Sequence, residues 1–265
     1  MIPDAVRALA EDPSAHTPAP VPDSGLERIL TDRYSILLGP VPSFTSIMRV
    51  RLRPDEVEAT VAEVRRIVAE RGHVKPVWWI GGSARPPDLV ERLLALGFEP
   101  NREPGWEPRC TAMALVEPPP TAEGIVARRI ETLAEYALAR EISGSAFETP
   151  QEEQEQWRSI DQQRFAAERR GNAPLTYLAW IDGTAVASAR SVLADAGVLL
   201  IGGGTVSEGR GRGAYRALVR ARWDEAVARG TPAVVVHAGA MSKPILERLG
   251  FQTVTEIDVL LDAAA

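Results

Sequence analysis

The pattern of hydrophobic and polar positions divides the first half of the chain into short strands and amphipathic helices. Positions 45–52 alternate between two faces, and positions 57–68 carry valines at helical spacing. We expect strands at 33–38, 45–52 and 77–80, and helices at 2–9, 53–71 and 87–96. Segment 12–24 is expected to form a loop across the surface because it contains four prolines, Pro13, Pro18, Pro20 and Pro22.

The second half carries more strands. Asp182 and Gly183 separate two apolar runs and predict a tight hairpin turn. Segment 151–170 is expected to be one charged helix with Trp157 and Phe165 on its inner side. We further expect strands at 125–130, 175–181, 184–193, 198–206, 233–237 and up to 261, and helices at 131–142, 213–229 and from about 242 to 249.

The two halves repeat one order of elements: strand, helix, strand, helix and then Gly-Phe. The segment at 83–98, SARPPDLVERLLALGF, is similar in sequence to the segment at 240–251, AMSKPILERLGF. We interpret this as an internal duplication; chance similarity of two such segments is the alternative. The proline-rich segment 117–124 predicts a stiff linker between a first domain, 1–116, and a second, 125–265.

Composition narrows the class of protein. The chain has 265 residues, of which 45% are hydrophobic and 25% charged, which suits one large or two ordinary globular domains. One cysteine, Cys110, and three scattered histidines predict neither a disulfide nor a metal site. The net charge of −6 makes nucleic acid an unexpected partner, and no signal-peptide pattern or membrane-length apolar run is found. We expect a cytoplasmic protein; its oligomeric state is left open.

A glycine-spaced turn between a strand and a helix is the main candidate for chemistry. The stretch from 206 begins V-S-E-G-R-G-R-G-A-Y, and Gly211 and Gly213 let backbone N–H groups approach a ligand closely. Unpaired amides at a helix start favour a phosphate or carboxylate, and Arg210 and Arg212 add charged donors. A Walker loop would need a lysine and a hydroxyl residue after Gly213, which are absent. A dinucleotide-binding fingerprint would need the third glycine at a different spacing from the second. A basic helix start without a ligand is the alternative.

This turn resembles the pyrophosphate loop of the GNAT superfamily of acyl-CoA-dependent N-acyltransferases, written Gln/Arg-x-x-Gly-x-Gly/Ala. Arg210 stands at the first position and Gly213 at the fourth, whereas Tyr215 occupies the last, where the family has glycine or alanine. The order of elements over 125–261 is also that of the whole GNAT fold. The resemblance implies an α/β (α+β) protein of two GNAT-like domains, each with a mixed, mostly antiparallel sheet flanked by helices.

The first domain departs from this pattern. Its corresponding helix begins R-P-D-E at Arg53, without glycines and with two carboxylates at the positive helix end. These carboxylates would repel a pyrophosphate. We therefore expect a degenerate half without a phosphate loop, serving as scaffold or as a wall of the substrate cleft.

The resemblance also implies acetyl-CoA as co-substrate and no metal. In the family the carrier arm inserts between two strands that splay apart. Here the backbone of Thr205 and Val206 would contact that arm. The pyrophosphate would lie on the turn formed by Arg210, Gly211, Arg212, Gly213, Ala214 and Tyr215.

The residues that would move protons are less evident. The family's usual tyrosine corresponds to Leu246, and its usual asparagine to Gly239. His237, at a strand end, is a candidate base because imidazole has a suitable pKa, although a structural role is the alternative. Glu148, in a loop near the expected acceptor site, is a second candidate base. Ser242 is expected to cap the last helix or to contact the carrier arm.

The predicted function is transfer of an acetyl or acyl group from acyl-CoA to the amine of a small molecule by direct attack. Two alternatives remain: a CoA-binding or sensory module without turnover, and a GNAT-fold enzyme with another donor, such as an aminoacyl-tRNA. Four aromatic residues either line an acceptor pocket or belong to the core: Trp157, Tyr177, Trp180 and Trp223.

Overall fold

The computed structural model describes residues 1–20, 24–103, 105–171 and 173–265. Its described strands form one sheet in the order β1-β2-β3-β4-β12-β6-β11-β10-β9-β8-β7, with β5 paired to β12. The strands are β1 (Glu27–Leu30), β2 (Ser35–Leu38), β3 (Thr45–Met48), β4 (Val77–Ile80), β5 (Glu99–Pro100), β6 (Arg109–Leu115), β7 (Val126–Arg129), β8 (Leu175–Ile181), β9 (Thr184–Ala194), β10 (Gly197–Thr205), β11 (Val234–Ala238) and β12 (Gln252–Leu261).

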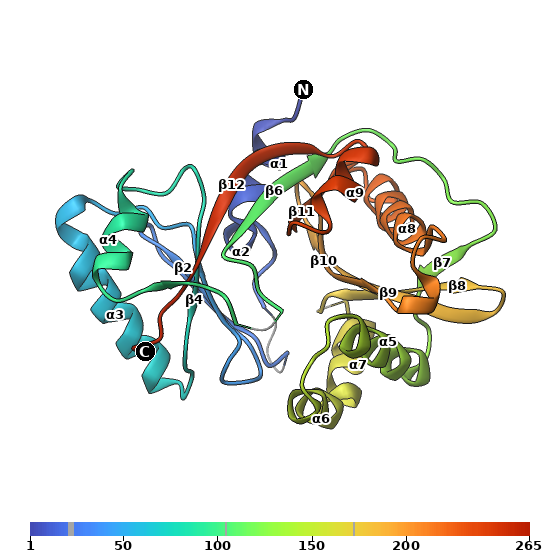
Figure 1. The fold of residues 1–265 in the computed structure, drawn as a ribbon, viewed down its shortest axis with the longest axis horizontal. Helices are drawn as coiled ribbons and strands as arrows, with labels where there is room; N and C mark the ends of the chain where they lie inside the picture. The colour runs from blue at the N-terminus through green and yellow to red at the C-terminus, as the bar shows by residue number, and fades with distance from the viewer. Residues whose placement is uncertain (21–23, 104, 172) are drawn as a thin grey trace.

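Helices cover both faces of this sheet (Figure 1). They are α1 (Asp4–Glu11), α2 (Pro13–His16), α3 (Val57–Glu70), α4 (Leu89–Ala95), α5 (Leu133–Ala146), α6 (Gln151–Ser159), α7 (Asp161–Arg169), α8 (Ala214–Ala228) and α9 (Lys243–Arg248), with 3₁₀ turns η1 (Pro54–Glu56) and η2 (Ser207–Gly209). Among the described residues, no helix combines the length and apolar composition needed to span a bilayer.

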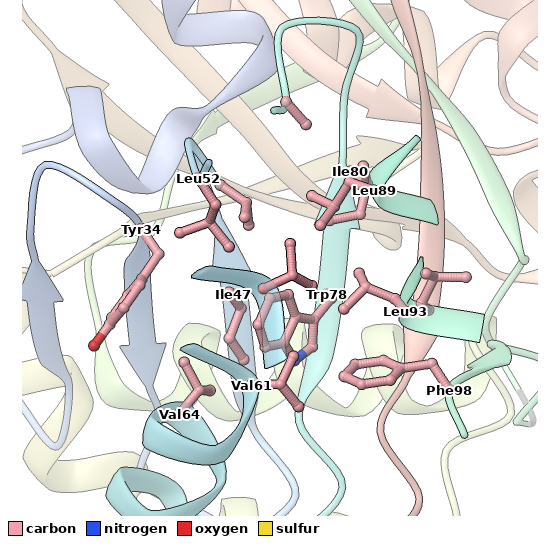
Figure 2. Packing of buried hydrophobic residues seen from close by; sticks show 14 of the residues in the cluster. Tyr34, Ile47, Leu52, Val61, Val64, Trp78, Ile80, Leu89, Leu93 and Phe98 are labelled. Atoms are coloured by element: carbon pink, nitrogen blue, oxygen red, sulfur yellow. The ribbon is translucent and has the colours of Figure 1, made fainter. Parts of the chain in front are cut away.

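The first half packs around Trp78 on β4. Its indole ring is fully buried and meets the ring of Phe98 edge to face, with centroids 5.4 Å apart. The valines of α3, including Val61 and Val64, close over this ring because their helical spacing places them on one side (Figure 2). The first half therefore has a hydrophobic core of its own.

The two halves share strands. β6, from the first half, lies between β11 and β12 of the second, and β12 pairs with both β6 and β4. Figure 1 shows β6 and β12 crossing the middle of the molecule. The sheet therefore runs without a break across the predicted boundary at 117–124, which stays a prediction. Strand β6 was not predicted, although the residues of its run C-T-A-M-A-L are all buried.

Helix α1 covers the junction of the halves. Its apolar side, formed by Val6, Leu9 and Ala10, packs on Val235 of β11 and Ile257 of β12. The last turn of α1 thus lies near the carboxyl end of β11.

In the second half, α8 and α9 cover one face of the sheet, and α5 and α7 the other. Leu218 of α8 packs on Ala187 and Ala189 of β9, whereas Tyr136 of α5 packs on Leu178 of β8. Tyr177 and Trp223 are buried in the α8 side, so they belong to the core. These two residues do not line an acceptor pocket.

Several predicted elements need correction. Segment 12–24 is not all loop, because Pro13 begins α2; Pro22 lies outside the described residues. Strand β1 was not predicted. The predicted strand 45–52 stops at Met48, because Arg49 takes a positive φ of 54° and donates its N–H to the Asp12 carboxylate at 2.9 Å. The predicted helix 151–170 is two helices, broken at Ile160, and Asp161 then pairs with Arg140 of α5 at 2.8 Å.

Candidate functional site

β10 and β11 separate at their carboxyl ends. They pair in parallel at three successive positions, the last being Leu200 with Val236. Beyond this point β10 bulges between Ile201 and Gly204 and stays paired with β9, where Thr205 faces Ala187. Because β10 follows β9 and leaves β11, a gap with unpaired backbone groups opens between the two central strands.

The backbone of Thr205 faces this gap. The N–H of Val206 donates to Val186 on the β9 side at 3.0 Å, and its carbonyl accepts from Gly209 at 3.0 Å. Since successive residues of a strand direct their hydrogen-bonding groups to opposite sides, those of Thr205 are directed away from β9. Of the two residues expected to contact the carrier arm, Thr205 thus has its backbone turned to the gap, whereas that of Val206 is already bonded.

The turn before α8 forms a set of free amides. Gly211 and Gly213 have positive φ angles of 74° and 93°, and Gly213 is the N-cap of α8. Such angles suit glycine and direct successive N–H groups outward. Within the described part of the chain, no acceptor is found for the N–H groups of Gly211, Arg212, Gly213, Ala214 and Tyr215. Together with the positive end of a 15-residue helix, they form an anion-binding nest.

Two arginines flank the nest. The Nε of Arg210 donates to the Thr205 carbonyl at 3.2 Å, and Arg212 pairs with Asp182 of the β8–β9 turn at 3.0 Å. Both side chains are exposed, and exposed pairs contribute little free energy. Their remaining N–H groups are available to phosphate oxygens.

Tyr215 accommodates its unusual place in the loop by turning inward. A Cβ on Gly203 would lie 2.9 Å from the Tyr215 ring, so the ring packs directly on the glycine backbone of β10. Burial raises the pKa of the Tyr215 hydroxyl. The side chain thus leaves the nest, while the N–H group stays in it.

His237 lies on β11 one residue beyond the last pair with β10. Its Nε2 is 2.8 Å from the Ala10 carbonyl, and its ring stacks on Trp79 with centroids 5.3 Å apart. A carbonyl only accepts, so Nε2 carries the proton and Nδ1 the lone pair. Burial lowers the pKa of His237 below its ordinary value of 6.5, which keeps the ring neutral at neutral pH. Glu11 adds negative charge nearby, and it could not be predicted as a neighbour of His237 because α1 is distant along the chain.

The other two candidates lie at the start of α9 and after α5. Ser242 begins α9, but its hydroxyl donates to the Gly239 carbonyl at 3.2 Å and does not cap the helix as expected. Glu148 is exposed between α5 and α6, where the preceding Phe147 would be 3.2 Å from a Cβ on Gly204. Leu246, at the position of the usual tyrosine, is fully buried in the core.

The matching place in the first half is closed. There Arg85 donates to Val50 at 3.0 Å and accepts from Leu52 at 3.1 Å, so the strand paths stay joined up to the helix start. Asp55 and Glu56 then occupy the first turn, and the Glu56 carboxylate accepts from the Arg53 N–H at 2.8 Å. Neither a gap nor free amides for a phosphate are present among these residues.

The sequence matches no profile of a known protein family, and no curated protein matches it. Solved structures do match. A GCN5-related N-acetyltransferase from Kribbella flavida is 19% identical, with 90% of each chain covered and a TM-score of 0.64. A tandem GNAT protein from the clavulanic acid biosynthesis pathway is 17% identical, with 88% of this chain and 78% of its own covered and a TM-score of 0.60. A GCN5-related N-acetyltransferase from Sphaerobacter thermophilus is 17% identical, with 99% and 96% covered and a TM-score of 0.59.

These comparisons define the fold. The chain has the fold of the GCN5-related N-acetyltransferases, as a mixed sheet flanked by helices. More particularly, its twelve-stranded sheet corresponds to the tandem arrangement of that fold. The resemblance inferred from the loop and from the order of elements is thereby confirmed, as is the predicted fold class.

Proposed function

We propose that the protein transfers an acetyl or other acyl group from acyl-CoA to the amine of a small molecule. The observation that carries this proposal is the nest of free amides from Gly211 to Tyr215, placed beside the gap between β10 and β11. The first feature fits a pyrophosphate, and the second fits an extended arm with its own amide groups.

Each group at the site then has a defined part. The amides of the nest hold the pyrophosphate, and the backbone of Thr205 hydrogen-bonds the arm. The thioester supplies the activated acyl group. Nδ1 of His237 removes the proton from the attacking amine, directly or through a water. Ser242, at the start of α9, is a proposed contact for the arm, and Glu148 is a second proposed base.

Calorimetry with acetyl-CoA, followed by thiol release from acetyl-CoA across a panel of amines, tests the proposal. Saturable binding with turnover supports it. The absence of binding contradicts the nest assignment.

A second candidate function rests on Leu246. Because an apolar, fully buried side chain replaces the usual proton donor, a CoA-binding or sensory module without turnover shares the same nest. Binding of acetyl-CoA without thiol release from any amine would favour that function. An aminoacyl-tRNA donor would show itself by steeply salt-dependent binding of charged tRNA, which the net charge of −6 disfavours.

A further inference from the structure

The register of the sheet places Arg190, Ile201 and His237 in one row. Arg190 of β9 is directly opposite Ile201 of β10, and Ile201 and His237 are the first residues beyond the last β10–β11 pair. Residues in one row of a sheet extend their side chains from the same face. This shared face is covered by α5 and α7 beside Arg190 and by α1 beside His237. Arg190 and His237 therefore lie on the same face of the sheet, on opposite sides of β10.

Arg190 is a half-buried arginine whose guanidinium makes no ion pair in the described part of the chain. Its Nε is shielded from solvent and has no hydrogen-bond partner in the part of the chain that the structure describes. Glu168 attracts Arg190 through its charge, but its carboxylate accepts hydrogen bonds from the N–H and the hydroxyl of Thr176, at 2.8 and 2.7 Å. A shielded donor without an acceptor is costly unless a ligand supplies one.

A second arginine, Arg164, lines the same hollow as Arg190. Arg164 of α7 donates from Nε to the Tyr136 hydroxyl at 3.1 Å and stacks over the Trp157 ring at 4.8 Å, and it too has no carboxylate within 4.0 Å among the described residues. Burial and the charge of Arg164 lower the pKa of Arg190 to about 10. Two like charges held together by the fold form a binding point for an anion.

Between the two arginines lies a small hollow. Its walls include Leu26, Tyr136, Pro174 and the two arginines, and its volume is about 10 Å³. This is room for a water-sized group. An oxygen of a carboxylate fits it, whereas a bulky head group does not.

We propose that Arg190 and Arg164 bind the carboxylate of the acceptor, so that the acceptor is a small amino acid. This inference rests on the proposed acyl transfer and adds the chemical class of the acceptor. β9 and β11 are two strand spacings apart, about 10 Å. An acceptor whose carboxylate reaches Arg190 thus extends toward His237, where its amine meets the thioester.

The test compares matched pairs of amines in the thiol-release assay on the full chain. The pairs are β-alanine with propylamine, 4-aminobutyrate with butylamine and 6-aminohexanoate with hexylamine; taurine tests whether a sulfonate replaces the carboxylate. For at least one pair, kcat/KM for the amino acid is expected to exceed that of the alkylamine by about 10-fold or more. Arg190→Gln is expected to abolish this preference by raising KM for the amino acid. Equal rates within every pair, or a preference only for the sulfonate, would overturn the proposal.

A matched control guards against misfolding. Arg164→Gln removes the second guanidinium and lowers the preference, whereas Arg169→Gln changes an exposed arginine of the same helix and has no effect. If Arg190→Gln does not fold, the comparison of Arg164→Gln with Arg169→Gln tests the proposal in its place. If no amine releases thiol, the proposed acyl transfer fails, and calorimetric titration of 6-aminohexanoate then judges the anion site separately. Saturable binding that Arg164→Gln weakens supports the site, and no binding overturns it.

Discussion

Leu200 and Val236 are the last residues at which β10 and β11 pair, whereas in the first half Arg85 stays bonded to Val50 and Leu52 beyond the end of β3. The tandem halves therefore differ in one local relationship: whether two parallel strands stay joined up to the start of the next helix. Where they separate, a glycine turn with free amides follows. Where they stay joined, acidic residues occupy the helix start. One open and one closed copy explain why we place a single site in the chain.

The first prediction concerns the nest. Gly213 has a φ of 93°, and a Cβ there would lie 3.2 Å from both the Arg216 guanidinium and Ile125. Gly213→Val is expected to weaken acetyl-CoA binding by about 10-fold or more, because it displaces amides that donate to the pyrophosphate. Calorimetry measures the affinity.

Gly230 supplies the matched control, since it also has a positive φ, 75°, with nothing within 4 Å of its Cβ position, and it lies beyond the other end of α8. Gly230→Val imposes similar backbone strain but leaves the affinity unchanged. Equal affinities in the two variants would contradict the nest assignment.

The second prediction concerns Tyr215. Its ring packs on Gly203, and its N–H belongs to the nest, so the side chain contributes to stability and not to binding. Tyr215→Ala is expected to lower the free energy of unfolding by about 2 kcal/mol and to change acetyl-CoA affinity by less than about threefold. Urea titration and calorimetry measure these two quantities. A large loss of affinity in a stable variant would mean that the ring itself lines the cofactor path.

Local signals were enough to predict the elements that depend on their own residues. Asp182 and Gly183 both take positive φ angles, as the hairpin turn requires, and the predicted strand 77–80 matches β4. β6 was missed because its strand partners, β11 and β12, come more than 100 residues later in the sequence. The early end of β3 likewise depends on Asp12, a residue of another element.

The same distinction holds for the site. The glycine spacing of the turn predicted the nest, because φ preferences belong to single residues. The environment of His237 could not be predicted, because it is made by Ala10 of α1 and Trp79 of β4. The row that joins Arg190 to His237 depends on strand register, which the sequence leaves open.

The third prediction concerns pH. Burial lowers the pKa of His237 below 6.5, and a base must be deprotonated to act. In a plot against pH, kcat/KM is therefore expected to be constant above pH 6.5 and to fall as the pH decreases below it; this falling part is the acid limb. His237→Gln, which keeps a donor for the Ala10 carbonyl, removes this limb and lowers the plateau by about 100-fold. An unchanged acid limb in the variant would exclude His237 as the base.

The same shift predicts acid sensitivity of the fold. The unfolded chain binds a proton at His237 near pH 6.5, whereas the folded chain binds it only at lower pH. The contribution of His237 to the free energy of unfolding is thus complete above pH 6.5 and decreases as the pH falls toward the pKa of the folded state. Urea titrations of the wild type and His237→Gln should differ in slope against pH in this window.

The last prediction concerns the junction of the halves. Asp262 follows β12, is fully buried and accepts two hydrogen bonds from Arg65 of α3, both at 2.8 Å. Asp262→Asn leaves the Arg65 charge without its partner, so we expect a loss of about 2 kcal/mol, less than for a fully buried pair because Arg65 is partly exposed. Glu70→Gln breaks an exposed pair with Arg66 on the same helix and should cost at most about 0.5 kcal/mol. Because β12 continues the sheet from one half into the other, a single cooperative urea transition is expected in both variants. Two separate transitions in Asp262→Asn would mean that this ion pair, and not the shared strands, holds the halves together.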